Sequence, residues 1–334
     1  VKACGDSGAM NEGQEIHAEM ARMGFLQHNH LVGSALVEMY VKWGALAKAH
    51  DVFSKIPVRN RFAWNTLIAG YVEKGMPGKA LDYYEEMQVE GSVPDSFTFV
   101  WSLKACGNLG KVDKGQEIHL EIVRDGLLEK DVMVGNALLD MYGKCGAILQ
   151  AQAVFGSLSQ RCVVSWTAML SAFVDQQQGE KAILLYRQMQ EEGPDPNYQT
   201  ILLALGGCCT LAGAEKTNPT GDFSMKEMSL EIGRALHAQA YRKSFASQVF
   251  VGNSLVNMYG SCGSIVEAEN AFSALASHNV VSWTAIISSY VEDDQGEKAL
   301  QLYTQMHREN ISPDPQTFVV ALEACVSVAR KKRD

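Results

Sequence analysis

Three histidines are the first candidates for chemistry in this sequence. His17 and His119 each stand two residues before a glutamate, and this His-x-Glu spacing is one half of a zinc-dependent deaminase signature. The other half, Pro-Cys-x-x-Cys, supplies the remaining metal ligands and occurs nowhere in the sequence. Both histidines, with His237 as a third, follow an aliphatic residue at one place in a recurring pattern. We therefore expect all three to be packed or half-buried side chains of helices.

The eight cysteines are the second candidates. They stand singly or as the adjacent pair Cys208 and Cys209, and no Cys-x-x-Cys occurs, which argues against a disulfide framework and a zinc ribbon. We expect small core residues where cysteines share places in the recurring pattern, namely at Cys4, Cys106, Cys145, Cys262 and Cys325. No phosphate-binding glycine loop and no Gly-x-Ser-x-Gly is present. The sequence thus predicts no enzyme, no metal, no cofactor and no small-molecule substrate.

Composition limits the remaining classes. The chain has 334 residues, of which 47% are hydrophobic and 20% charged, as in folded proteins. No apolar run is long enough to predict a membrane span. The formal charge of -9 argues against a protein that holds nucleic acid by bulk attraction. The chain starts at Val1 without a methionine, so we expect either a fragment or the loss of a targeting segment.

An internal repeat organises the whole sequence. The six residues VVSWTA occur at 163–168 and again at 280–285, and RFAWNT at 61–66 aligns with both. Around them the chain divides into three kinds of repeat. Repeats of 35 residues span 61–95, 163–197 and 280–314, and short repeats of 31 residues span 30–60, 132–162 and 249–279. A long repeat of 36 residues spans 96–131, with a partial copy at 1–29, an expanded copy at 198–248 and a truncated copy at 315–334.

Each repeat has the pattern of two helices. In the first 35-residue repeat Trp64, Leu67, Ile68 and Tyr71 form one apolar stripe, and a second stripe follows a polar turn. Hairpins this small bury both stripes only by stacking. The expected fold class is therefore all-α, a right-handed α-solenoid superhelix of stacked helix-turn-helix repeats whose first helices line the concave face. The expanded copy should carry its 15 extra residues as a surface loop near 210–229, between its two helices.

At these residues the sequence resembles the pentatricopeptide-repeat proteins, and specifically the plant PLS subgroup, which alternates 35-residue, long and short repeats. The resemblance covers nearly the whole chain and rests on the Trp-Asn or Trp-Thr start, the Ile-His of the long repeat and the MYVKWG, MYGKCG and MYGSCG segments of the short repeats. It implies sequence-specific binding of single-stranded RNA, one nucleotide per repeat, in a chloroplast or mitochondrion. The family often selects a cytidine for conversion to uridine, here with editing or processing factors supplied in trans.

The resemblance also assigns roles to residues. The fifth residue of a repeat, here called the reader, hydrogen-bonds the base edge, and the last residue, the support, assists it. The implied pairs are Ser34 with Asn60 and Thr167 with Asn197 for adenine, Asn65 with Asp95 for uracil, Asn253 with Asn279 for a pyrimidine, Thr284 with Asp314 for guanine, and the weaker pair Asn136 with Cys162. Second-position side chains, the sandwich residues, enclose each base: Leu31, Phe62, Phe97, Met133, Val164, Phe250 and Val281.

Some positions depart from this scheme. The long repeats have Val100 and Leu202 as fifth residues, which cannot hydrogen-bond a base, and Gln199 is a polar residue at a sandwich position. Lys42 and Lys144 recur on short repeats and are the expected phosphate contacts, a thin basic strip.

Two alternatives stay open. The threonines and asparagines of the reader pairs could only cap helices. The array could also be a protein-binding scaffold of the tetratricopeptide type, although polar reader pairs favour RNA.

Overall fold

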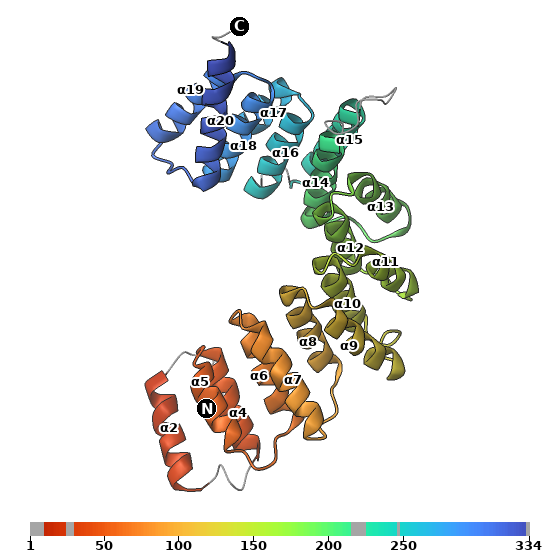
Figure 1. Ribbon diagram of the computed structural model, residues 1–334, viewed down its shortest axis with the longest axis vertical. Coiled ribbons are helices and arrows are strands. Elements are labelled where there is room, and N and C mark those ends of the chain that lie inside the picture. Colours follow the sequence, from red (N-terminus) through yellow and green to blue (C-terminus); the bar gives the residue numbers. More distant parts are fainter. Residues whose placement is uncertain (1–9, 25–29, 215–224, 246–247, 332–334) are drawn as a thin grey trace. The chain divides into compact units, whose positions relative to one another are not determined.

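A computed structural model describes residues 10–24, 30–214, 225–245 and 248–331. This part of the chain forms 18 α-helices and no strand, so the expected all-α fold is confirmed. Contacts divide the chain into two compact units, Val1–Arg161 and Cys162–Asp334. Each unit is a stack of helical hairpins in chain order, which is the expected solenoid arrangement (Figure 1).

The first unit has nine described helices. They are α2 (Met10–Arg22), α4 (His30–Lys42), α5 (Leu46–Ser54), α6 (Arg61–Glu73), α7 (Pro77–Val89), α8 (Ser96–Leu109), α9 (Val112–Arg124), α10 (Val132–Lys144) and α11 (Ile148–Ser157). The first helices α4, α6, α8 and α10 pack on one another in order, and each also packs on the second helix that follows it. The unit therefore has a layer of first helices and a layer of second helices.

The second unit repeats this pattern. Its described helices are α12 (Val163–Asp175), α13 (Gly179–Glu192), α14 (Tyr198–Ala214), α15 (Met225–Arg242), α16 (Val249–Ser261), α17 (Ile265–Ser273), α18 (Val280–Glu292), α19 (Gly296–Arg308) and α20 (Pro315–Lys331). In both units every first helix from α4 to α20 begins at the residue where the sequence pattern starts a repeat.

The predicted apolar stripes form the core. Trp64, Trp166 and Trp283 are fully buried, one in each 35-residue repeat, and the other residues of their stripes are buried with them. Glycines allow the closest helix approaches. A Cβ atom built on Gly179 at the start of α13 would lie 2.5 Å from the carbonyl oxygen of Gly207 and 2.7 Å from the backbone nitrogen of Leu211, both in α14. Only glycine fits against the backbone at that point.

The three histidines hold the long repeats to the short repeats. His17, His119 and His237 on second helices each place Nδ1 at 2.8–2.9 Å from the hydroxyl of a tyrosine on the next first helix, at Tyr40, Tyr142 and Tyr259 respectively. Burial lowers the pKa of each of these histidines. Their expected role as half-buried helical residues is confirmed.

Two expectations need correction. Cys106 and Cys262 are buried and Cys145 is partly buried, but Cys325 is exposed, because it lies on a face of α20 that no described helix covers. Cys4 lies outside the described residues. The segment 210–229 is not one loop, since α14 extends to Ala214 and α15 begins at Met225. Its middle part, 215–224, lies outside the described residues.

The close approach at Gly179 gives a test of the packing. Gly179→Ala should lower the free energy of unfolding by about 1–3 kcal/mol, because the added methyl group meets backbone atoms. Gly156→Ala on α11 is the control, since nothing lies within 4 Å of its added Cβ. That control should be neutral or stabilising by up to about 1 kcal/mol. Denaturant unfolding measures both, and equal effects would contradict the assigned packing.

The histidine–tyrosine bonds give a pH test. The pKa of His119 is lowered below its ordinary 6.5 by burial, so the unfolded chain binds a proton more readily than the folded one. The free energy of unfolding therefore keeps its full value above about pH 6.5 and decreases as the pH drops below that value. We expect His119→Gln to lose less stability than the wild type between about pH 7.5 and 5.5 in denaturant unfolding. Tyr142→Phe keeps the titrating group and should retain the pH dependence.

Candidate nucleic-acid interface

The support residues are the N-caps of the next first helices. The Asn60 Oδ1 atom accepts a hydrogen bond from the Ala63 backbone N–H at 2.9 Å, which starts α6. Asp95 and Asn279 cap α8 and α18 in the same way, and Asn197 and Asp314 accept from Thr200 and Thr317. Capping is thus one role of the asparagine and aspartate supports, although the alternative had it as their only role.

Three readers are hydrogen-bonded directly to these caps. Ser34 Oγ donates to Asn60 Oδ1 at 3.0 Å, Asn65 Nδ2 donates to Asp95 Oδ1 at 3.0 Å, and Asn253 Nδ2 donates to Asn279 Oδ1 at 3.3 Å. The structure therefore brings together the two residues of each of these predicted pairs. Capping and pairing are compatible, because one oxygen accepts both bonds.

The other pairs differ. Thr167 Oγ1 donates to the Val163 carbonyl oxygen one turn back, while Asn197 caps α14 without a hydrogen bond to Thr167. Thr284 reaches its support through a third residue, since the Thr317 hydroxyl lies 2.7 Å from both Thr284 Oγ1 and Asp314 Oδ1.

Asn136 and Cys162 fall in different units. The Cys162 N–H donates to Ser165 Oγ at 3.1 Å.

Asn65 has the most complete set of partners. Thr98 Oγ1 lies 2.6 Å from its Oδ1 atom, while Asp95 accepts from its Nδ2 atom. Because a carboxylate only accepts, Asp95 fixes which end of the amide is the donor. Burial opposes ionisation of Asp95, but bonds from Thr98 and Asn65 and the charge of Arg61 outweigh it and lower the pKa of the carboxyl. Sequence reasoning missed Thr98, although the Asp-x-x-Thr spacing of a capping box pointed to it.

The residue before each support is held as well. In the short repeats Arg59 Nε and Arg161 Nε donate to the carbonyl oxygens of Phe53 and Phe155 at 3.3 and 3.0 Å, and each guanidinium lies over the phenylalanine ring. His278 occupies the same place on Phe272. In the 35-residue repeats this residue is a proline, at positions 94, 196 and 313. Both devices restrict the backbone that leads to the support residue.

The sandwich residues are apolar and exposed. All seven lie in the first turn of a first helix with 48–72% of their surface accessible: Leu31, Phe62, Phe97, Met133, Val164, Phe250 and Val281. The readers Ser34, Asn65, Asn253 and Thr284 are by contrast only 3–7% exposed. The first-helix layer therefore presents protruding apolar side chains above recessed polar ones.

A hollow in the first unit combines these features. It has a volume of about 350 Å³ and is lined by Phe62 and Phe97 from neighbouring repeats, with Asn65 between them in the sequence. The rest of its lining includes Thr66, Glu38, Lys42 and Glu73. Two aromatic side chains, an oriented amide and charged groups thus surround one space of the size of a small planar ligand.

The two predicted phosphate contacts are engaged in ion pairs. Lys42 Nζ lies 3.4 Å from Glu38 and Lys144 Nζ lies 2.7 Å from Asp140, in each case one turn away on the same helix. Both lysines are partly exposed. Such exposed pairs are weak, so the lysines keep the freedom to exchange a carboxylate for a phosphate.

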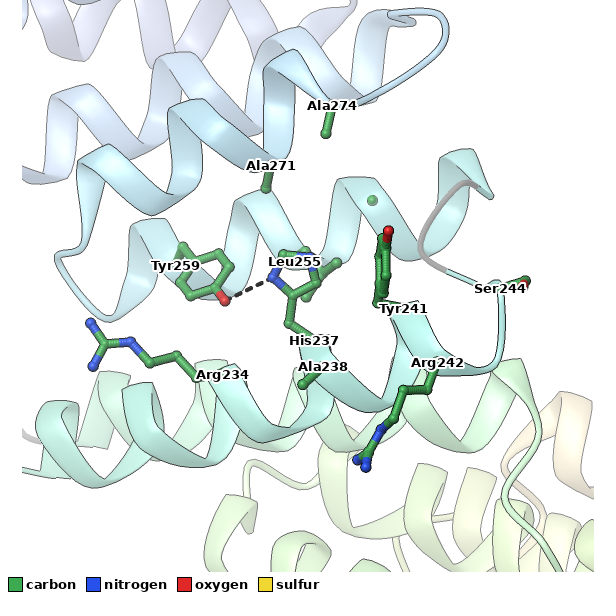
Figure 2. A pocket seen from close by; sticks show the side chains of 11 residues that line it. Arg234, His237, Ala238, Tyr241, Arg242, Ser244, Leu255, Tyr259, Ala271 and Ala274 are labelled. Carbon is green, nitrogen blue, oxygen red and sulfur yellow. Dashed lines mark hydrogen bonds between the residues drawn. The ribbon is translucent and has the colours of Figure 1, made fainter.

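A larger hollow in the second unit lies between the second helices α15 and α17 and the first helix α16. It encloses about 1190 Å³ between α15, α16 and α17, and Figure 2 shows the His237–Tyr259 hydrogen bond and the Tyr241 ring within it. Arg234 at its edge is bound by Glu267 at 2.8 Å. Small side chains, Ala238, Ala271 and Ala274, leave the space open. No predicted reader, support or sandwich residue lines this hollow.

Two further features bear on the site's chemistry. No group of three or more metal-binding side chains is placed to hold a metal ion among the residues that the structure describes. Within the same residues, no helix has the length and apolar character to cross a membrane.

Comparison with known proteins gives a family match for part of the chain. Three segments, 59–108, 161–210 and 278–327, match the model of the PPR repeat family. These three segments are similar to PPR repeats. Each match starts two residues before a 35-residue repeat and ends in the first helix of the following long repeat, so the first match includes Asn65, Asp95 and both aromatic residues of the 350 Å³ hollow.

Curated relatives agree with this result. A chloroplastic pentatricopeptide repeat-containing protein of Arabidopsis thaliana is 32% identical over 98% of this chain and 36% of its own length. Another is 33% identical over 98% of this chain and 58% of its own length. The chain thus spans about one third to just over one half of these relatives. A crystal structure of the pentatricopeptide repeat protein PPR10 in complex with an 18-nt psaJ RNA element is 18% identical, with a TM-score of 0.45 over 90% of this chain and 53% of that one.

The double role of Asn60 can be tested by stability. Asn60→Ala removes the N-cap of α6 together with the partner of Ser34, so we expect a loss of about 1 kcal/mol or more in the free energy of unfolding. Ser34→Ala leaves the cap in place and should cost less. Denaturant unfolding of both variants and of the double variant measures the coupling. Fully additive effects would mean that the Ser34–Asn60 bond contributes nothing.

Proposed function

We propose that this chain binds single-stranded RNA in a sequence-specific way along the first helices of its repeats. The observation that carries the proposal is the hollow between Phe62 and Phe97 with Asn65 in its lining. Unpaired bases bind proteins by stacking on aromatic side chains while a polar group hydrogen-bonds their edge. This hollow offers both, and a duplex could not present its bases in this way.

The assignment of uracil to this repeat has a physical reason. Uracil presents an N–H donor beside carbonyl oxygens, and an amide offers the matching acceptor and donor. Asp95 holds the Asn65 amide in one orientation, with Nδ2 towards the carboxylate. After these internal bonds Asn65 retains one N–H and one lone pair for a base. The other assignments follow the family resemblance, repeat by repeat.

Charge sets the strength of binding. The net charge is -9, and the two recurrent lysines already have carboxylate partners. A phosphate contact at either of these two lysines must therefore replace an ion pair. We propose modest affinity that depends on salt, with specificity from the readers.

We also propose a place in the cell and a role. The alternation of 35-, 36- and 31-residue repeats supports the PLS subgroup, and the chloroplastic names of several relatives support an organelle, the chloroplast before the mitochondrion. The RNA-bound segment would then mark a site for editing or processing factors that act in trans.

Reciprocal exchange of two reader pairs tests the proposal. Asn65→Thr with Asp95→Asn should change the preference at one nucleotide from uracil to adenine, and Thr167→Asn with Asn197→Asp should make the opposite change. Each exchange should shift selectivity by about 1–3 kcal/mol, as for a good base-edge contact. Selection from a random single-stranded RNA pool, followed by binding of the selected RNAs, measures the change.

The outcomes are distinct. Folded variants that keep the wild-type preference would remove the reader role. A wild type that binds duplex and single-stranded RNA equally, or that binds neither, would remove the proposed function in favour of a protein-binding scaffold.

A further inference from the structure

The long repeat 96–131 has no polar side chain at its reader position. Its fifth residue is Val100, which offers no hydrogen bond to a base. The repeat nevertheless borders the 350 Å³ hollow through its sandwich residue Phe97. Its first helix, α8, carries two further residues near Phe97 that no role so far explains, Trp101 and Lys104.

These residues lie close together on the helix surface. The rings of Phe97 and Trp101, one turn apart, have centroids 6.0 Å apart and planes inclined by 55°. Lys104 Nζ lies 4.6 Å from the centre of the Trp101 ring. Phe97 and Lys104 are exposed and Trp101 is half-buried. Phe97, Trp101 and Lys104 form what we call the α8 platform.

The α8 platform faces the same side as the hollow. Trp101 is the sixth residue of its repeat, and the sixth residue of the preceding repeat is Thr66, which lines the hollow beside Asn65. Lys104 is the ninth residue, a place that Ala69 fills in the lining of the hollow. The platform therefore continues the row of groups that begins with the reader of repeat 61–95.

Packing does not require a tryptophan at this place. The other long repeats have Leu203 and Val320 as sixth residues, and the 35-residue and short repeats have small ones. Repeats of the same fold thus form their cores without a large ring here. The largest side chain at this place belongs to a long repeat, in which the fifth residue cannot hydrogen-bond a base.

Lys104 also differs from the two recurrent lysines in the partner of its ammonium group. Lys42 and Lys144 each pair with a carboxylate on their own helix. Within the described part of the chain, no carboxylate oxygen lies within 4.0 Å of Lys104 Nζ. The ammonium group contacts the Trp101 ring instead. The ammonium group is exposed and is held beside an aromatic ring.

We propose that the α8 platform is a nucleotide-binding site that accepts any unpaired base. The base stacks on the Trp101 ring, and the Phe97 ring, inclined by 55° to it, contacts the edge of the base. Lys104 leaves its place over the Trp101 ring and contacts the phosphate of the RNA backbone. Every base has a face that can stack, and a phosphate contact carries no sequence information. The site rests on the proposed RNA binding and adds affinity to it at a position without selectivity.

Fluorescence provides a direct test. Trp64, Trp166 and Trp283 are at most 1% exposed, whereas Trp43 is partly exposed like Trp101. The fluorescence reference is therefore the Trp43→Phe protein, in which a change in emission on binding reports mainly on Trp101. Short single-stranded homopolymers of uridine, cytidine and adenosine are the probes. Each should quench the emission of this reference protein, because a base stacks on the Trp101 indole. Trp101→Phe keeps a ring for stacking and should bind nearly as well while losing most of the quenching.

Affinity separates the two contributions. Trp101→Ala should weaken binding of all three homopolymers by roughly ten-fold, a typical effect of losing one stacked base. Lys104→Gln should reduce the slope of log affinity against log salt by about 0.7, the value for one phosphate on a single strand. Leu203→Ala, at the same place in the expanded long repeat, is the matched control and should change little. Circular dichroism confirms that each variant is folded.

The outcomes separate this inference from the proposed function. If the wild type binds none of the homopolymers and no RNA from a random pool, the proposed function and the platform both fail. If it binds, but Trp101→Phe shows full quenching and Trp101→Ala full affinity, only the platform fails. A loss confined to one base would also overturn it, since the site would then be a selective reader.

Discussion

One oxygen atom at the end of a repeat accepts hydrogen bonds from two directions. Asn60 Oδ1 accepts from the backbone that starts α6 and from Ser34 in the repeat before it. Asp95 Oδ1 does the same for α8 and Asn65. Helix starts need such an acceptor, because the first N–H groups of a helix have no partner within it. In three repeats the position of the reader depends on this shared acceptor, which ties one side chain to the start of the next helix.

Much of the fold could be predicted from the sequence. The apolar stripes around Trp64, Trp166 and Trp283 and the starts of the first helices follow from periodicity, since every repeat must bury the same two faces. The placement of the three histidines followed from their shared position in the repeats. These features are local or repeated, so the same pattern in several repeats supports one structural prediction for all of them.

Other features depend on contacts that periodicity does not contain. Thr317 and Thr98 lie 33 residues along the chain from the readers that they contact, Thr284 and Asn65. Periodicity does not say which side chains come within hydrogen-bond distance at such a separation. The exposure of Cys325 depends on which helices cover α20 and not on its place in the repeat. Thr167 bonded to its own helix shows that identical repeat positions can use different hydrogen bonds.

The shared acceptor limits which residues can end a repeat whose reader bonds to its support. Asparagine and aspartate both accept a bond from a helix N–H, so exchanging one for the other preserves the helix start while it changes the group that the preceding reader meets. A change to alanine would weaken both at once. Exchange between asparagine and aspartate is therefore a route by which the proposed base preference can change at little cost in stability, whereas alanine at the same place removes the helix cap as well.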